Sequence, residues 1–317
     1  MFIEILAYCL LAGIALLAAF QLGRKSCTSS EGDVAKNSRV TRSKVRSSKD
    51  PSLECELVVL ENHCLRDALQ YFRRNAESRP AFDRLLSLYQ VERRFPDLSH
   101  FRLGPNMFDS INLDWIIFIN PTTGELVGHG ITTRFAWDQD IASLPGGWQG
   151  VVRASYIHSH VEQRQPNTLV GLFIFVEDQF RQQGWANNVI EEMRALAKRN
   201  AIQALIIPLR PPLRYKKEYA AMPMAEFAAL KRDDGLPLDH WIRLHTRLGA
   251  RILCASEKSH QHAMSVQDFH VQFSPIPLPE SGDMLVERNG EWYKIHVDLE
   301  RDFVLINQGC VWVRHVL

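Results

Sequence analysis

Residues 169–212 read LVGLFIFVEDQFRQQGWANNVIEEMRALAKRNAIQALIIPLRPP, and they decide the fold. Residues 169–176 form an apolar run of β-branched and aromatic side chains, which has the length and composition of a buried strand. A second apolar run, 204–208, comes near the end of the stretch. Between the runs, apolar residues recur at i, i+3, i+4 and i+7, which predicts an amphipathic helix marked by Val189, Ile190, Met193, Leu196 and Ala197. The stretch therefore predicts a strand-helix-strand unit.

The turn between the first strand and the helix reads Arg181-Gln182-Gln183-Gly184-Trp185-Ala186. Its small residues, Gly184 and Ala186, allow another group to come close to the backbone. The free amides and the positive end of the helix dipole meet at this turn, and together they favour an anion, most naturally a phosphate. The alternative is a glycine turn that only joins the strand to the helix.

The hexapeptide has the form Arg/Gln-x-x-Gly-x-Gly/Ala, and here the chain resembles the GNAT acetyltransferase superfamily, whose signature this is. The resemblance implies that the loop binds the diphosphate of acyl-coenzyme A (acyl-CoA), such as acetyl-CoA. One position departs from the pattern, because Asp178 stands where a proline is common, and a carboxylate near a diphosphate is unfavourable unless it points away. The implied binding residues are Arg181, Gln182, Gln183, Gly184, Trp185 and Ala186.

A second run, residues 233–250, reads DDGLPLDHWIRLHTRLGA. It is similar to a bacterial subgroup of GNAT proteins and to the GNAT-like domains of polyketide synthase loading modules. Residues 279–282 and 311–315 also resemble that subgroup, so the likeness covers most of residues 60–317. The resemblance implies an α/β (α+β) protein with the GNAT fold, in which a mixed, mostly antiparallel sheet carries flanking helices.

The remaining patterns give the other expected elements. Residues 57–94 are predicted to be helical, with a buried stripe at Phe82, Leu85, Leu86 and Tyr89. The runs 115–120 and 126–133 predict two strands joined by a turn. Residues 283–317 alternate as strands around Asn289-Gly290, and they predict a small antiparallel addition that covers the core.

The N-terminal residues suggest a membrane anchor. Residues 5–23 carry no charge and reach about 28 Å as a helix, so we expect one transmembrane helix after a short tail, 1–4. A cleaved signal peptide is the alternative, although Glu4 replaces its usual basic start. Residues 24–52 are rich in Ser, Lys and Arg and predict a disordered juxtamembrane linker. Their positive charge predicts a single-pass protein whose C-terminal domain is cytoplasmic.

The rest of the chain is expected to form a GNAT-like acyltransferase domain, 53–275, with a C-terminal β extension, 276–317, packed on it. A net charge of +1 argues against a nucleic-acid partner. The six cysteines lack Cys-x-x-Cys spacing, so they predict neither a disulfide framework nor a zinc site. His158 and His160 lack a third ligand in a matching motif, so a solvated polar loop is favoured and no metal is expected.

Acyl transfer needs a polarised thioester carbonyl, a deprotonated acceptor and a proton for the leaving thiolate. The resemblance implies that backbone amides near Phe175 and Val176, at the end of the first strand, polarise the carbonyl. Tyr219 and Tyr215 are candidates to protonate the thiolate. His245 titrates near neutrality and is a candidate general base, or a proton donor to an enolate. The alternative for His245 is a structural histidine.

We therefore expect a membrane-anchored GNAT-like acyltransferase that transfers an acyl (acetyl) group from acyl-CoA to a small-molecule or carrier-bound acceptor. Its expected partners are acyl-CoA, an acceptor and, through the N-terminal helix, the membrane. Three alternatives stay open. The protein could be a malonyl-thioester decarboxylase or acyl-to-carrier-thiol transferase, a non-catalytic CoA-binding module, or a membrane-tethered scaffold.

Overall fold

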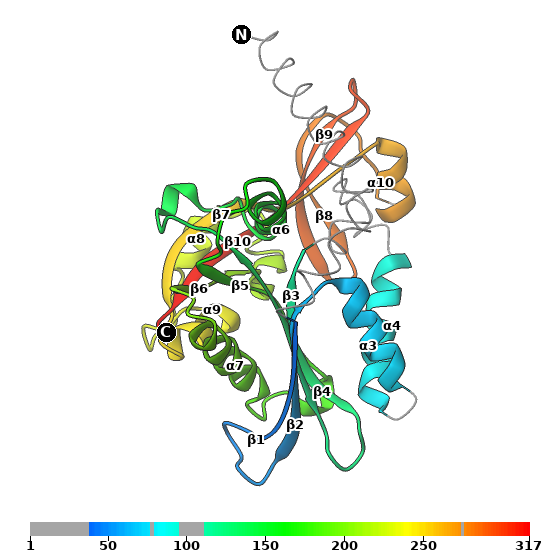
Figure 1. Ribbon diagram of the computed structural model, residues 1–317. Helices are drawn as coiled ribbons and strands as arrows, with labels where there is room; N and C mark the ends of the chain where they lie inside the picture. Colours follow the sequence, from blue (N-terminus) through cyan, green and yellow to red (C-terminus); the bar gives the residue numbers. More distant parts are fainter. Residues whose placement is uncertain (1–37, 77–78, 95–110, 274–275) are drawn as a thin grey trace.

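The computed structural model describes residues 38–76, 79–94, 111–273 and 276–317 (Figure 1). The strands are β1 Arg39–Arg46, β2 Glu54–His63, β3 Leu113–Ile119, β4 Leu126–Phe135, β5 Thr168–Val176, β6 Ala204–Leu209, β7 Arg251–Met264, β8 Gly282–Arg288, β9 Glu291–Asp298 and β10 Phe303–His315. The α-helices are α3 Leu65–Ala76, α4 Pro80–Arg94, α6 Trp148–Tyr156, α7 Trp185–Arg199, α8 Met224–Ala229, α9 His240–Arg247 and α10 Val266–Phe273.

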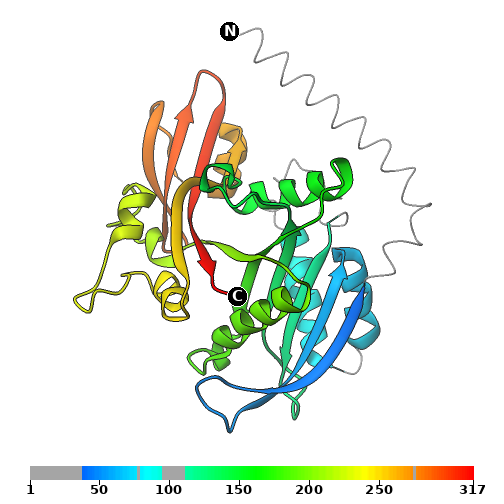
Figure 2. The same ribbon diagram turned by 60° about the vertical axis from the view of Figure 1, so that its left-hand side comes forward.

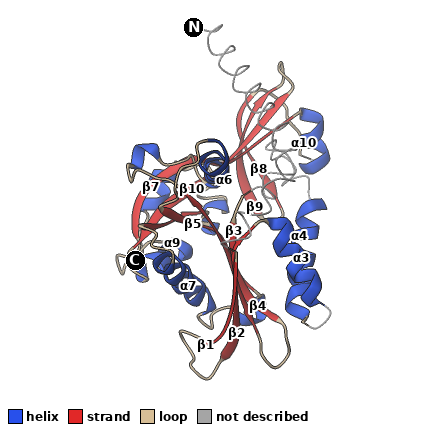
Figure 3. Cartoon of the chain, in the orientation of Figure 1, coloured by secondary structure: helices blue, strands red, loops and turns tan. Residues whose placement is uncertain are grey.

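One mixed sheet organises these elements. Its strands follow the order β1-β2-β3-β4-β5-β6-β10-β9-β8, and β7 pairs with β10. Among the described strands, only β5 and β6 run parallel to each other. Figure 3 shows α7 on one side of the sheet and α3 with α4 on the other. The prediction of a mixed, mostly antiparallel sheet with flanking helices is confirmed.

The alternation of side chains along β2 explains why helices cover both faces. Leu57 and Val59 belong to the core that includes Val189 of α7. Val58 and Leu60 belong to the opposite core, with Phe72 of α3. Successive side chains of a strand point to opposite faces, so an uninterrupted apolar run requires cover on both sides.

The predicted strand-helix-strand unit is confirmed as β5, α7 and β6. The apolar stripe of α7 is fully buried, as its spacing predicts. Gly130 of β4 allows α7 to lie close to the sheet, because an added Cβ would be 2.5 Å from Val189 Cγ1. The two strands predicted at 115–120 and 126–133 are β3 and β4.

The prediction of a disordered linker over 24–52 is wrong for its described part. Residues 39–46 form β1, which pairs with β2 along eight residues. The basic composition suits this edge strand, because Arg42 lies 3.0 Å from Glu56 and Lys44 lies 3.1 Å from Glu54 across the pair. Backbone pairing with β2 and opposite charges stabilise a segment that contributes few side chains to the core.

The prediction of helix over 57–94 is wrong for its first residues, which belong to β2. The buried run 57–60 lies between β1 and β3 in the sheet, and a short apolar run does not by itself distinguish a strand from a helix. The rest of the segment forms α3 and α4, and Phe82 and Leu85 of the predicted stripe are fully buried.

The C-terminal addition is more than a cover on the core. Strands β8 and β9 form the predicted hairpin, and the first residues of β10, 303–306, pair with β9. The later residues of the same strand, 311–315, pair with β6 and lie within the main sheet (Figure 2, red strand). The C-terminal strand thus completes the sheet beside β6.

The transmembrane helix predicted at 5–23 lies outside the described residues. In the part of the chain that the structure describes, no helix is long and apolar enough to cross a membrane.

Candidate active site

Strands β5 and β6 separate soon after they begin. They pair only from Thr168 with Ala204 to Val170 with Ile206. On its other side, β5 stays paired with β4 but contains one extra residue at Leu172, opposite the step from Ile131 to Thr132. Such a β-bulge bends a strand and increases its twist, which accounts for the divergence of β5 from β6 at this point.

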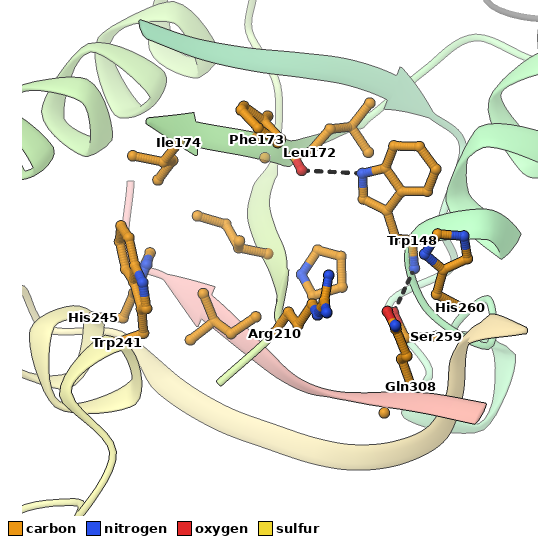
Figure 4. Close-up of a pocket in the computed structure, with 15 residues that line it drawn as sticks. Trp148, Leu172, Phe173, Ile174, Arg210, Trp241, His245, Ser259, His260 and Gln308 are labelled. Carbon is orange, nitrogen blue, oxygen red and sulfur yellow. Dashed lines mark hydrogen bonds between the residues drawn. The ribbon is translucent and has the colours of Figure 1, made fainter. Parts of the chain in front are cut away.

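A cavity of about 310 Å³ occupies the space between the diverging strands. Residues 171–174 of β5 form one wall, and residues 207–210 form the other. Figure 4 shows Trp241 and His245 of α9 at one end, and Trp148 and His260 at the opposite end. Most of the wall is apolar, so the few polar groups that face the cavity define its chemistry.

His245 is the most constrained polar group of the cavity. Its side chain is fully buried, and its Nδ1 lies 2.8 Å from Nε2 of His315. Within the described chain, its Nε2 is buried and has no hydrogen-bond partner. Burial, with the nearby His315 and Arg194, lowers the pKa of His245 to about 3. The residue is therefore neutral at physiological pH, and its Nε2 is a buried polar atom without a partner in the described chain.

The helix that carries His245 is fixed by a buried N-cap. Oδ1 of Asp239 accepts hydrogen bonds from the backbone amides of Trp241 at 2.8 Å and Ile242 at 3.1 Å. Oδ2 accepts a third, from the amide of Leu213 at 3.1 Å. An N-cap aspartate satisfies amides that the helix itself leaves unpaired, so α9 begins at a defined place relative to the segment after β6.

Trp148 makes two hydrogen bonds at the opposite end of the cavity. Its indole Nε1 donates to the carbonyl oxygen of Leu172 at 3.0 Å, and its amide donates to Oγ of Ser259 at 3.0 Å (Figure 4). Oε1 of Gln308, from β10, is buried and without a hydrogen-bond partner among the described residues. Burial, His262 and Arg210 lower the pKa of His260 to about 3. This end therefore offers neutral polar groups.

The predicted phosphate loop precedes α7 as expected. Gly184 is the N-cap of α7 and has a φ of +95°, a conformation that favours glycine. Asp178, the residue that departs from the family pattern, lies 2.7 Å from Arg181. The charge of this carboxylate is therefore offset within the loop itself.

The turn between β1 and β2 lies against the phosphate loop. Oγ of Ser48 donates to the carbonyl oxygen of Gly184 at 3.0 Å, and Nζ of Lys49 donates to that of Gln182 at 3.3 Å. Asn188 of α7 accepts from the amide of Ser48 at 2.9 Å. A Cβ on Gly184 would lie 2.6 Å from Oγ of Ser48, so this contact requires glycine. An ammonium group and hydroxyls thus adjoin the loop.

The two candidate tyrosines do not line the cavity. The hydroxyl of Tyr215 accepts from Nε of Arg210 at 2.8 Å, and burial raises the pKa of Tyr215. Tyr219 packs edge to face on Phe227 within the core below α7. Their proton-donor role stays a sequence prediction that our proposal does not use.

Phe175 and Val176 lie beyond the last β5 residue of the cavity wall, Ile174. They are paired with His129 and Gly128 of β4. Their proposed role in polarising the carbonyl stays a prediction from the family resemblance.

Arg243 and His158 both contact other parts of the protein. Arg243 donates to the carbonyl oxygens of Pro237 and Leu238, both at 2.8 Å. The ring of His158 stacks on Phe135. No group of three possible metal ligands occurs in the described part of the chain.

Sequence reasoning assigns no role to His315, Gln308 or Arg194, which the structure places at or behind the cavity. His315 is separated from His245 by 70 residues. The two rings meet because β7, which follows α9 directly, pairs with the end of β10 and places Arg314 opposite Arg251. The family resemblance at 311–315 is the one signal that points to this residue.

No protein-family model matches the sequence. A curated relative, the arginine N-acetyltransferase avaD of Aspergillus versicolor, is 32% identical over 121 residues, covering 36% of this chain and 41% of that protein. The predicted resemblance to the GNAT acetyltransferase superfamily is confirmed by this match. The chain thus matches only about two fifths of the length of this relative.

Two solved structures are also similar. The loading GNATL domain of CurA from Lyngbya majuscula is 16% identical, with 71% of this chain and 81% of that one covered and a TM-score of 0.39. A Bacillus subtilis acetyltransferase in complex with CoA is 11% identical, with coverage of 68% and 86% and a TM-score of 0.30.

Proposed function

We propose that this protein is a GNAT-type acyltransferase that transfers an acyl group, such as acetyl, from acyl-CoA to a small-molecule or carrier-bound acceptor. The observation that carries the proposal is the cavity between β5 and β6, which lies on the strand that leads into the phosphate loop and α7. An extended thioester with a diphosphate at one end suits this arrangement of a narrow apolar cavity and a helix N-terminus.

The residues around the cavity and loop fit acyl-CoA. The backbone of residues 181–186 would hold the diphosphate, and Lys49 would add a positive charge beside it. The pantetheine arm and thioester would lie along 171–174, where the apolar wall excludes water. The buried, unpartnered Nε2 of His245 offers a polar contact inside the cavity.

The proposed reaction is a nucleophilic substitution at the thioester carbonyl. The acceptor forms a bond to the carbonyl carbon, the carbonyl oxygen carries the negative charge of the tetrahedral intermediate, and the C–S bond then breaks. The acceptor loses a proton and the thiolate of CoA gains one. A hydrogen-bond donor close to the carbonyl oxygen stabilises the intermediate.

A second candidate function is decarboxylation of a malonyl thioester, and the charge of the cavity favours it. Arg210 is the one formally charged side chain among the described residues of the lining, and no described lining residue is a carboxylate. A substrate carboxylate would therefore find a counter-ion in Arg210, which lies 3.9 Å from Glu291 in the structure. In this reaction the bond to the carboxylate breaks, its electron pair forms the enolate of the thioester, and CO₂ leaves.

Calorimetric titration of the full chain with acetyl-CoA, malonyl-CoA and free CoA tests the proposal. We expect binding at micromolar level, and loss of binding in Gly184→Asp, which places a negative side chain against Ser48 and the diphosphate site. The matched control is Gly290→Asp, because Gly290 also has a positive φ, of +81°, but lies in the turn between β8 and β9 with open space around it. Equal loss in both variants would indicate a folding defect.

The three ligands also separate the candidate functions. Turnover of malonyl-CoA to acetyl-CoA and CO₂ without an acceptor supports the decarboxylase, whereas acetyl transfer to an added amine or carrier thiol supports the acyltransferase. Binding without any turnover indicates a CoA-binding module. Failure of the wild-type chain to bind any of the three contradicts the proposal and leaves the scaffold alternative.

The membrane anchor and the cytoplasmic location of the domain belong to this proposal as expectations from the sequence. The uncharged run at 5–23 and the basic residues after it support them. Fractionation of cells that express the full chain, with and without a charged substitution such as Leu16→Arg, is the direct test.

A further inference from the structure

Three side chains form a hydrogen-bonded row that ends at the cavity. Nη2 of Arg194, on α7, lies 3.1 Å from Nδ1 of His315, on β10. Nε2 of His315 lies 2.8 Å from Nδ1 of His245, on α9. The remaining nitrogen of His245, Nε2, belongs to a residue that lines the cavity. The row connects three elements, and its bond between His315 and His245 is buried.

The direction of each hydrogen bond follows from the first residue. A guanidinium group has only donors, so Nδ1 of His315 must be the acceptor. A neutral imidazole carries one proton, which in His315 must then be on Nε2. That N–H can donate only to a nitrogen without a proton, so Nδ1 of His245 is unprotonated. The single N–H proton of the neutral His245 ring is therefore on Nε2.

Both rings are neutral under ordinary conditions. Burial, with the nearby Arg194, lowers the pKa of His315 to about 4. Arg194 is itself held in place, since it also donates to the carbonyl oxygen of Leu248 and lies 2.5 Å from Glu191. The donor at the start of the row is therefore fixed.

We propose that Arg194 and His315 are positioning residues that hold His245 in the tautomer with its proton on Nε2, so that His245 presents an N–H donor to the cavity. This inference rests on the proposed function and deepens it. It replaces the general-base hypothesis for His245, because the imidazole has no free lone pair on the side of the substrate. A neutral histidine in a buried site is a known way to stabilise a developing oxyanion.

The donor would serve either candidate reaction. In acyl transfer it stabilises the oxygen of the tetrahedral intermediate, and in decarboxylation it stabilises the enolate oxygen. His245 keeps its proton in both cases, because transfer of that proton would leave an imidazolate anion in a buried site. The proton that the product requires must come from another group or from water.

The direct test is the tautomer of His245 in the full chain without ligand, measured by two-bond ¹H–¹⁵N correlation of its imidazole. His245→Asn identifies the signals by their loss. We expect a protonated Nε2 and a bare Nδ1 between about pH 6 and 8, since the unperturbed pKa of histidine is about 6.5. A proton on Nδ1, or a charged ring in this range, would overturn the proposal.

Two substitutions at His315 form a matched pair. In His315→Gln the side-chain amide can accept from Arg194 and donate to His245, so the tautomer should be kept. In His315→Glu the carboxylate only accepts, so Nδ1 of His245 should gain the proton and the tautomer should reverse. An unchanged tautomer in a folded His315→Glu variant contradicts the inference. If that variant does not fold, the wild-type and His315→Gln spectra still test the inference, because both should show the proton of His245 on Nε2.

The role of Arg194, the first residue of the row, is tested by two substitutions on α7. Arg194→Met removes the donor to His315, so we expect the signals of His245 to show a mixture of both tautomers. Arg199→Met is the control, because Arg199 lies on the same helix but pairs with Glu192 at 2.8 Å. The same single tautomer in Arg194→Met would show that Arg194 does not direct the row.

Kinetics separates this inference from the proposed function. We expect His315→Leu to lower kcat about 10- to 100-fold, as loss of an orienting partner does, with an unchanged KM for acyl-CoA. His315→Gln should recover most of that loss. If the wild-type chain shows no turnover, the proposed function fails, whereas the tautomer measurement still confirms or contradicts the row.

Discussion

Nζ of Lys49, in the turn between β1 and β2, donates to the carbonyl oxygen of Gln182 at 3.3 Å. A cation from the N-terminal hairpin therefore lies beside the loop that we expect to bind a diphosphate. Lys49→Met should weaken binding of CoA about fivefold, since an exposed charge contributes about 1 kcal/mol. Titration at low and high salt measures the effect, which should shrink as salt screens the charge.

The control for this prediction is Lys44→Met, on β1 but paired with Glu54. Equal weakening by both substitutions would mean that total charge matters rather than the position of Lys49.

Asn188 connects the same hairpin to α7. Its Nδ2 donates to the carbonyl oxygen of Arg46 at 2.8 Å, and its Oδ1 accepts from the amide of Ser48 at 2.9 Å. Asn188→Ala should lower the free energy of unfolding by about 2 kcal/mol, because each lost hydrogen bond contributes about 1 kcal/mol. Urea unfolding measures this value. Asn187→Ala, at the neighbouring position of α7, is the control, and a similar loss there would show that the loss is not specific to the contacts of Asn188 with the hairpin.

Asp239→Ala should damage both stability and activity. Three backbone amides lose their acceptor, and loss of an N-cap alone costs about 1 to 2 kcal/mol. Since Asp239 fixes the start of the helix that carries His245, kcat should fall as well. The control is Asp234→Ala, because Asp234 lies in an exposed turn, where it accepts from the amide of Leu236 at 3.1 Å and lies 3.6 Å from Arg232. Retention of full activity in a folded Asp239→Ala variant would show that the N-cap does not position His245.

Stability should fall in acid because several histidines are buried in their neutral form. Burial lowers the pKa of His129 and His245 to about 3, and the pKa of His315 to about 4. In the unfolded chain these groups take up protons below about pH 6.5, whereas in the folded chain they stay neutral until about pH 3 to 4. The stabilising effect is therefore complete above pH 6.5 and is lost as the pH falls toward 4.

The contribution of one histidine can be isolated with His129→Leu, because His129 of β4 is not one of the residues that line the cavity, although its ring stacks on Phe173, which does line it. Each such group contributes a slope of up to about 1.4 kcal/mol per pH unit to the free energy of unfolding. We expect the slope between pH 4 and 6 to decrease by about that amount in His129→Leu. An identical slope in the variant and the wild type would mean that His129 titrates normally in the folded chain.

The elements that sequence reasoning predicted are those whose signal is local. The repeat along α7 and the run of β5 each lie within one segment, so the unit around the phosphate loop could be read directly. Strand β7 was not predicted, because its residues 251–264 are mostly polar and partly exposed, and its place depends on pairing with β10. Strand β1 was not predicted either, because its residues are rich in basic side chains and mostly exposed, and its place depends on pairing with β2.

The candidate site likewise contains features with a local sequence signal and features that depend on residues far apart in the chain. His245 was a candidate because its residue type and helical position carry chemical meaning. Its tautomer depends on Arg194 and His315, which come from two other elements, so no spacing in the sequence reports it. The contact of Ser48 and Lys49 with the phosphate loop likewise joins segments about 135 residues apart. Long-range pairing of strands decides both features.

Strand β10 belongs to two parts of the molecule at once. Residues 303–306 pair with the C-terminal hairpin, and residues 311–315 border β6 and end at His315. The 13 residues of β10 form one continuous strand of about 43 Å, whose pairing with β7 shifts register between Gln308 and Cys310 and between Trp312 and Val313. A ligand or partner that tilts the hairpin would therefore also move the imidazole behind His245, so the hairpin and the cavity are mechanically linked.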